Sequence, residues 1–119
     1  MLNLDTHILL FALQGALTAR EKKVLSRERW GISAIVLWEI SKLHHKGRIT
    51  MGLDNPLLVS SLRRLHVWPV SREVCLNLAA LDFASDPADE LIASTSWTYD
   101  VPLVTRDELI RTSKLVKFA

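Results

Sequence analysis

The sequence predicts an α/β fold in which a central, mostly parallel sheet of about five strands is flanked by helices. Short β-prone apolar runs alternate along the chain with longer segments of helical periodicity, a rhythm typical of strands joined by crossover helices. No stretch is rich in proline, serine or glycine, and no repeat divides the chain. We therefore expect a single domain over residues 1–119.

The strands are expected in apolar runs at residues 2–4, 31–33, 67–70, 103–105 and 115–118. The helices are expected at residues 6–13, 18–29, 34–46, 56–65, 72–83 and 87–99, with a short one after Asp107. Residues with capping preferences support some of these ends. Ser33 precedes the third helix as an N-cap and Gly47 ends it, while Asp86 and Pro87 form an N-cap followed by a proline at the first helical position.

Composition excludes several classes of protein. The 119 residues include 15 Lys and Arg and 13 Asp and Glu, for a net charge of +2, and 49% are hydrophobic. These values exclude a disordered tail, a collagen-like array and a supercharged nucleic-acid arm. The single cysteine, Cys75, has no second thiol and no zinc-site spacing, so we expect it to be a buried small hydrophobe.

The start of the chain carries no basic segment, and its longest uncharged apolar run, residues 8–13, is too short to cross a bilayer. We therefore expect no membrane association and a cytoplasmic protein.

Two acidic residues directly follow predicted strands. Asp5 comes after the strand at residues 2–4, and Asp107 after the strand at residues 103–105. In a parallel α/β sheet the ligand crevice lies beyond the carboxyl ends of the strands, so both side chains point toward the expected site. Capping of the following helix explains either residue alone equally well.

Glu39 interrupts an apolar stripe. Its neighbours on the expected helix face, Val36, Ile40 and Leu43, are all apolar. A carboxylate directed toward a core costs several kcal/mol of stability unless it is paired, hydrogen-bonded, protonated or bound to a cation. A structural pair with a buried arginine is the alternative to a functional role.

Asp89 lies in the first turn of the helix expected from Pro87. A capping box with Asp86 is one interpretation. That interpretation does not explain why Asp86, Asp89 and Glu90 gather at one helix start.

Four acids are expected to converge at one end of the sheet: Asp5, Glu39, Asp89 and Asp107. Carboxylates crowded into one crevice repel one another unless cations neutralise them. Ligands that are all oxygen suit Mg²⁺ or Mn²⁺ rather than zinc. Such ions hold a phosphodiester, activate water and stabilise the leaving oxygen, so the sequence predicts hydrolysis of phosphodiester bonds, with these acids as catalytic residues and metal ligands.

Four segments carry a resemblance to a known family. They are LDTHILLFAL from Leu4, ISAIVLWEISKLHHKGRI from Ile32, DPADELIASTS from Asp86 and PLVTRDELI from Pro102. In this order and at this spacing they resemble a PIN domain, and specifically a VapC-type toxin ribonuclease of a bacterial or archaeal toxin–antitoxin pair. The resemblance covers nearly the whole chain. The conserved acids of the family fall on Asp5, Glu39, Asp89 and Asp107.

The resemblance implies a Mg²⁺- or Mn²⁺-dependent endoribonuclease that cuts structured RNA such as transfer or ribosomal RNA. It also implies a cognate antitoxin protein that holds the enzyme inactive, and a homodimer. Thr6 would help to position metal-bound water or phosphate near Asp5, and Thr105 would do so near Asp107; helix capping is the alternative for both. Asp86 is expected to reach the metal through water.

The chain departs from this subtype at one segment. Many relatives read HRDPFDRL where this chain reads ASDPADEL over residues 84–91. A histidine is therefore missing, and Glu90 replaces an arginine, which adds negative charge beside the expected metal site.

An acidic site repels RNA unless basic residues surround it, because phosphate neutralisation supplies most non-specific affinity. Arg106 is the best-placed candidate because it adjoins Asp107. The other candidates are Lys42, Lys46, Arg48, Arg63, Arg64 and Arg72. Tryptophans offer base stacking in principle, although core or dimer packing is the interpretation we favour for most of Trp30, Trp38, Trp68 and Trp97.

Two other enzyme or signalling classes fit less well. A phospho-receiver domain needs paired acids after the first strand and a lysine after the last, and a phosphatase of the haloacid dehalogenase type needs Asp-x-Asp, where this chain has His7. The main alternative is a PIN fold that binds RNA or a protein partner without cutting.

Overall fold

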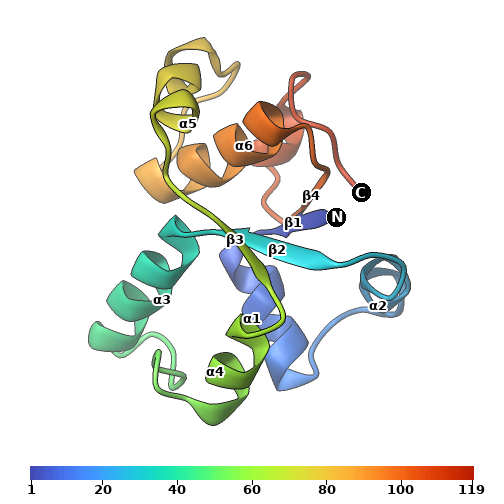
Figure 1. Cartoon of the computed structure of the whole chain (residues 1–119), viewed down its shortest axis with the longest axis vertical. Helices are drawn as coiled ribbons and strands as arrows, with labels where there is room; N and C mark the ends of the chain where they lie inside the picture. Colours follow the sequence, from blue (N-terminus) through green and yellow to red (C-terminus); the bar gives the residue numbers. More distant parts are fainter.

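Short apolar segments of the chain form a four-stranded sheet in the computed structural model, which describes all residues from 1 to 119 (Figure 1). The strands are β1 (Leu2–Leu4), β2 (Trp30–Ser33), β3 (His66–Trp68) and β4 (Leu103–Val104), arranged in the order β3-β2-β1-β4. Every neighbouring pair is parallel. The prediction of an α/β fold with a parallel sheet is therefore confirmed.

The expected fifth strand at residues 115–118 does not form. This segment meets β4 at one isolated parallel bridge, between Leu103 and Phe118. Strand β4 is only two residues long, so its outer edge has room for little more than this one pair. The sheet consequently has four strands rather than about five.

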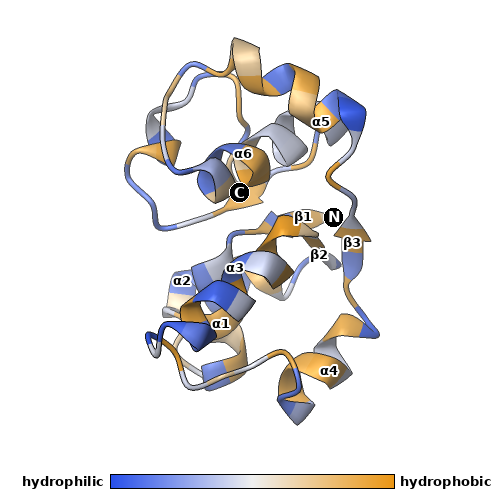
Figure 2. Ribbon diagram, turned by 90° about the vertical axis from the view of Figure 1, so that its left-hand side faces the viewer, coloured by the Kyte–Doolittle hydropathy of each residue, from blue (hydrophilic) through white to orange (hydrophobic).

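All the predicted helices are present, although several are shorter than expected. They are α1 (Thr6–Gln14), α2 (Ala19–Leu25), α3 (Ile35–His45), α4 (Pro56–Leu62), α5 (Arg72–Asn77) and α6 (Pro87–Tyr99), with 3-10 turns η1 (Leu78–Ala80) and η2 (Ile110–Thr112). Helix α2 ends at Leu25, whose carbonyl accepts a hydrogen bond from the Trp30 indole at 2.7 Å. Two views show α5 and α6 on one face of the sheet, and α1, α3 and α4 on the other (Figure 2).

The predicted helix ends are largely confirmed. Gly47 takes a left-handed conformation, with φ of 72°, just after α3, and its N–H donates to the His44 carbonyl. Asp86 occupies the N-cap position of α6, before Pro87, but its side chain makes no capping hydrogen bond. Ser33 lies one residue too early to be the N-cap of α3, although its hydroxyl accepts from the Ile35 N–H at 3.3 Å.

The core gathers apolar side chains from the sheet and from both helical layers. Its fully buried members include Leu2, Leu4, Ile8, Leu9, Ile32, Val36, Ile40, Leu58, Ile92, Leu103 and Ile110. The expectation for Cys75 is wrong, because this thiol is exposed on α5. Successive helical positions point in different directions, and here Val74 takes the core position. None of the helices combines the length and the apolar character that a bilayer span requires.

The carboxyl ends of β1 and β4 lie side by side. The Asp5 N–H donates to the Val104 carbonyl at 3.0 Å, which fixes the residue after β1 against β4. On the other side of β1, the buried Asn3 amide donates to the Ile92 carbonyl at 3.1 Å and to the Ser96 hydroxyl at 2.9 Å. These bonds attach α6 to β1, so the elements that carry the predicted acids are held together.

Candidate active site

Asp5 lies at the centre of the candidate site. It is the N-cap of α1, and its side chain is only 4% exposed. Its carboxylate accepts hydrogen bonds from the Thr6 N–H at 2.8 Å and from the Thr105 hydroxyl at 2.6 Å. Burial raises the pKa of Asp5, against the lowering effect of these two hydrogen bonds. Capping and a functional role are therefore combined in one residue.

Thr105 connects Asp5 with Asp107. The Thr105 hydroxyl donates to Asp5 and, at 3.0 Å, accepts the backbone N–H of Asp107. Asp107 in turn accepts the Ile110 N–H at 2.9 Å, which starts the η2 turn. Asp107 is close enough to Asp5 that its negative charge also raises the pKa of Asp5. The acids that follow β1 and β4 are thus neighbours.

Asp89 joins this group from the first turn of α6. Burial raises its pKa from 3.8 to about 6, opposed by a 2.9 Å hydrogen bond from the Ser85 hydroxyl. The negative charges of Asp5, Glu39 and Asp107 raise it further. All four predicted acids therefore lie close enough for their charges to act on one side chain.

Glu39 enters from α3 and is half-buried rather than placed in the core. Its neighbours Val36 and Ile40 are fully buried, so Glu39 lies at the edge of their apolar stripe. It forms no ion pair, and the alternative of a buried arginine partner is not realised.

The donors of this cluster fit a hard divalent cation. Every side-chain donor is an oxygen, as Mg²⁺ and Mn²⁺ prefer, and the mutual repulsion around Asp89 is of the kind that a cation relieves. The fully buried Thr6 hydroxyl beside Asp5 has no hydrogen-bond partner. No three acidic, histidine or cysteine side chains lie close enough together to form a ready-made metal cage. The arrangement therefore suits a cation such as Mg²⁺, which takes one or two carboxylates and keeps several waters.

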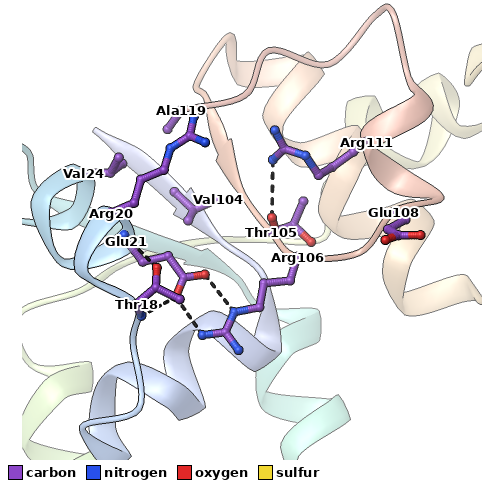
Figure 3. Close-up of a pocket in the computed structure, with 10 residues that line it drawn as sticks. All are labelled: Thr18, Arg20, Glu21, Val24, Val104, Thr105, Arg106, Glu108, Arg111 and Ala119. Carbon is purple, nitrogen blue, oxygen red and sulfur yellow. Dashed lines mark hydrogen bonds and ion pairs between the residues drawn. The ribbon is translucent and has the colours of Figure 1, made fainter.

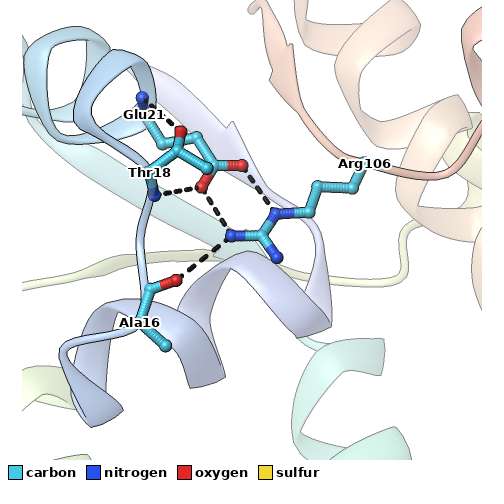
Figure 4. A network of polar contacts seen from close by, with 4 residues as sticks. All are labelled: Ala16, Thr18, Glu21 and Arg106. Carbon is cyan, nitrogen blue, oxygen red and sulfur yellow. Dashed lines mark hydrogen bonds and ion pairs between the residues drawn. The ribbon is translucent and has the colours of Figure 1, made fainter.

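Arg106 does not point freely toward substrate in this structure (Figure 4). Its guanidinium donates two 2.7 Å hydrogen bonds to the carboxylate of Glu21 and one of 3.2 Å to the Ala16 carbonyl. The same group lies 4.0 Å above the centre of the Phe11 ring. The pairing lowers the pKa of Glu21 from 4.5 to about 2. Arg106 therefore fixes the Thr105–Asp107 loop against α1 and α2.

Two hollows meet at this loop. A small one of about 290 Å³ is reached by two of the four acids, and is lined by Asp5, His7, Phe11, Arg106 and Asp107. The other, of about 430 Å³, lies beyond Arg106 and contains none of the four acids (Figure 3). Its walls include Arg20, Glu21 and Arg111, so of these two hollows only the smaller one contains predicted acids, Asp5 and Asp107.

Three supporting residues were not predicted from the sequence. Glu21 completes a capping box with Thr18 and also holds Arg106, but Thr-x-x-Glu in a sequence indicates only the cap. Ser85 binds Asp89, and Asn3 joins β1 to α6. A polar residue inside a strand as short as β1 was the available signal for Asn3.

Asp86 precedes α6, which carries Asp89, and Thr6 follows Asp5 at the start of α1. Asp86 is exposed and lines a groove that also contains Glu39. Neither its side chain nor the fully buried Thr6 hydroxyl makes a hydrogen bond, and of the two only Asp86 is exposed to solvent.

Comparison with known proteins agrees with this fold. The family model described as PIN domain matches residues 3–113. The VapBC2 complex of Rickettsia felis, bound to a DNA fragment from its promoter, is similar with a TM-score of 0.78 and 20% identity, covering 100% of this chain and 98% of that one. FitAcB of Neisseria gonorrhoeae is similar with a TM-score of 0.70 and 19% identity, covering 100% and 97%. No sequence among the curated proteins matches.

A third similar structure is VapBC-1 of nontypeable Haemophilus influenzae, with a TM-score of 0.67 and 16% identity, covering 100% of this chain and 97% of that one. At these identities the likeness establishes the fold. The acids selected from the sequence accordingly lie on the same overall scaffold as these complexes.

Proposed function

The chain belongs to the PIN-domain family, and from that premise we propose that it is a metal-dependent endoribonuclease that hydrolyses RNA phosphodiester bonds as the toxin of a toxin–antitoxin pair. One observation carries the proposal: Asp5, Glu39, Asp89 and Asp107 are brought from four separate elements close enough for their charges to act on one another, and burial together with these charges raises the pKa of Asp89. A cluster of carboxylates that is kept in spite of the repulsion between their negative charges is typical of a cation site.

In this proposal Asp5, Glu39, Asp89 and Asp107 hold Mg²⁺ or Mn²⁺, some directly and the others through its waters. A bound divalent cation supplies Lewis-acid stabilisation of charge on the phosphate and a lowered pKa for attacking water. Thr105 fixes the position of Asp5 relative to Asp107 through its hydrogen bonds to both residues, and Ser85 orients Asp89. Thr6 and Asp86 offer free oxygens near phosphate or water, and Arg106 positions the loop that carries Asp107.

The partner proposed is a cognate antitoxin protein, together with a second copy of this chain as a homodimer. Support for the antitoxin comes from the similar structures, which are described as VapBC complexes and as a toxin–antitoxin complex from Klebsiella pneumoniae. Transfer or ribosomal RNA is the proposed substrate class.

A PIN fold that binds without cutting is the second candidate. The observation in its favour is that no three potential ligands are gathered into a ready-made metal cage. The two candidates differ in whether the acids are needed for RNA cleavage.

Cleavage of total cellular RNA by the purified protein decides between them. We expect discrete new 5′ ends with Mg²⁺ or Mn²⁺, lost with chelator and in Asp5→Asn and Asp89→Asn. The matched control is Asp54→Asn, because Asp54 is exposed in a turn outside the cluster. Cutting that survives both site substitutions would exclude the proposed site, and RNA binding without any cutting would favour the second candidate.

A further inference from the structure

A groove of about 480 Å³ lies between α3 and the start of α6, and most of its lining residues have no role in the chemistry described so far. Glu39 and Asp86 belong to its wall, so it opens directly beside the candidate acids. Its other walls bring together an exposed aromatic ring and three basic side chains: Trp38, Lys42, Lys46 and Arg48.

Trp38 is unusual because its side chain is 51% exposed, whereas Trp68 is buried in the fold. It precedes Glu39 on α3, and both side chains line the groove. Lys42, one turn further along, places its ammonium 5.8 Å from the centre of the Trp38 ring. An exposed indole with a cation beside it offers a flat stacking surface for an aromatic ligand.

The three cations of the groove are without acidic partners. The ion pairs of the protein involve the N-terminus with Glu28, Arg106 with Glu21 and Lys117 with Asp100. Lys42, Lys46 and Arg48 are all exposed and cluster where α3 ends and the chain turns at Gly47. Unpaired cations on one wall favour a ligand that carries repeated negative charge.

We propose that this groove holds an unpaired stretch of RNA, with a base stacked on Trp38 and backbone phosphates against Lys42, Lys46 and Arg48. The proposal rests on the proposed nuclease function and specifies the substrate as single-stranded at this point. A base within a duplex does not present its face to a side chain, whereas a base in a loop does. A strand held in this way passes Glu39 and reaches the acids. A protein partner would have to supply acidic side chains for these three cations, whereas an RNA strand carries a phosphate at every nucleotide.

Binding in chelator separates this groove from catalysis, because RNA is not cut without metal. The probe is a fluorescently labelled single-stranded RNA of about 12 nucleotides, within the usual range of site sizes. We expect Trp38→Ala to weaken RNA binding about fivefold to a hundredfold, which is the usual effect of losing one base–aromatic stacking contact. Trp38→Phe should retain most of the affinity, because phenylalanine also offers an aromatic face. Half of the Trp38 side chain is already in solvent, so its loss should leave the fold intact.

The cations are tested by the salt dependence of the same binding. Replacing Lys42, Lys46 and Arg48 together by glutamine should make the slope of log affinity against log salt shallower by about 2, from about 0.7 for each lost phosphate contact. Trp38→Ala should leave that slope unchanged. The matched control replaces three exposed cations in and after α2, Lys22, Lys23 and Arg27, by glutamine and should bind with the wild-type slope.

Three results would overturn the proposal that this groove binds unpaired RNA. One is wild-type RNA affinity in both Trp38→Ala and the triple variant. Another is equal binding of a duplex of the same length that is insensitive to Trp38→Ala. The third is a change in oligomeric mass with Trp38→Ala while RNA affinity stays unchanged, which would assign this face to a protein interface.

The experiments distinguish a failure of the RNA-groove proposal from a failure of the proposed nuclease function. If RNA cutting depends on Asp5 but Trp38→Ala cuts dilute RNA as fast as the wild type, the proposal of an RNA-binding groove is wrong and the proposed nuclease function is supported. If RNA binding depends on Trp38 and no cutting occurs, the RNA-binding groove is supported and the proposed nuclease function is wrong.

Discussion

The hydroxyl of Thr105 donates a 2.6 Å hydrogen bond to Asp5, joining residues 100 positions apart in the sequence. The same hydroxyl accepts the N–H of Asp107. One oxygen therefore sets the relative position of the acids that follow β1 and β4. This relationship exists because the two strands are parallel neighbours that end together.

Thr105→Val keeps the shape of the side chain and removes the bond. Asp5 would remain buried with only the Thr6 N–H as a donor, so its pKa should rise further and about 1–3 kcal/mol of stability should be lost. The rate of RNA cleavage should fall at least about tenfold, because a displaced Asp5 carboxylate would no longer hold the metal in the reactive geometry. Urea unfolding and initial cleavage rates measure the two effects.

Thr105→Ser is the matched rescue, since it restores the hydroxyl. Thr112→Val is the control on an exposed threonine whose hydroxyl bonds only to the Leu109 carbonyl. Cleavage by Thr105→Val at the wild-type rate would show that Thr105 does not position the site.

Asp89→Asn should stabilise the metal-free protein. The pKa of Asp89 is raised from 3.8 to about 6, so its stability penalty is absent below 3.8 and grows as pH rises through 6. With solvent screening at this half-buried site, the variant should gain about 1 kcal/mol at neutral pH and nothing at low pH. Chemical unfolding in chelator across this range measures the difference.

The same variant should lose its response to metal. Mn²⁺ relieves the repulsion among the acids in the wild type and should raise its melting temperature, with a smaller rise in Asp89→Asn. Asp54→Asn, outside the cluster, should behave as the wild type. An equal rise in all three proteins would argue against Asp89 as a ligand.

Glu21→Gln should weaken the attachment of the Arg106 loop. The two hydrogen bonds from Arg106 lower the pKa of Glu21 from 4.5 to about 2, so this stabilisation is complete above 4.5 and is lost as pH falls toward 2. Because the Arg106 side chain is 40% exposed, screening reduces the expected loss to about 1 kcal/mol at neutral pH. Unfolding curves of both proteins should converge at acid pH; a constant difference at every pH would assign the loss to packing instead.

Asn3→Ala should loosen α6 from β1. The substitution removes hydrogen bonds to the Ile92 carbonyl and the Ser96 hydroxyl inside the fold, and roughly 2–4 kcal/mol of stability should be lost. Because α6 carries Asp89, cleavage should fall even at temperatures where the variant stays folded. Asn55→Ala, which removes the N-cap hydrogen bonds of α4 from the Leu57 and Leu58 N–H groups, is the control and should leave cleavage unchanged. Full activity of folded Asn3→Ala would show that this attachment does not set the site.

Three of the four acids were identified from strand ends and helix starts, which are local features, and Glu39 from its place in an apolar helical stripe. Asp5 and Asp107 follow apolar runs, and Asp89 follows a proline at a helix start. In a parallel sheet such positions meet at one edge, so their convergence follows from the pattern once the fold class is known. The fifth strand was predicted wrongly because pairing depends on the length of β4, not on the β-propensity of residues 115–118.

The groups that hold the acids could not be predicted in this way. Glu21 and Arg106 are 85 positions apart, and Asn3 reaches across 93 positions to Ser96. Nothing in the local sequence distinguishes the capping role of Glu21 from its second role as partner of Arg106. The exposed position of Cys75 was missed for a related reason, since an apolar stretch does not state which of its members faces the core.

The sequence alone determined the fold class, the family resemblance and the four acids, because these depend on periodicity and on residues at element ends. Tertiary structure decided which side chains hold those acids, that Arg106 is paired with Glu21, and that Trp38 stands exposed beside unpaired cations. The physical reason is that hydrogen bonds, burial and charge repulsion depend on distances between segments far apart in the chain, and only folding sets those distances.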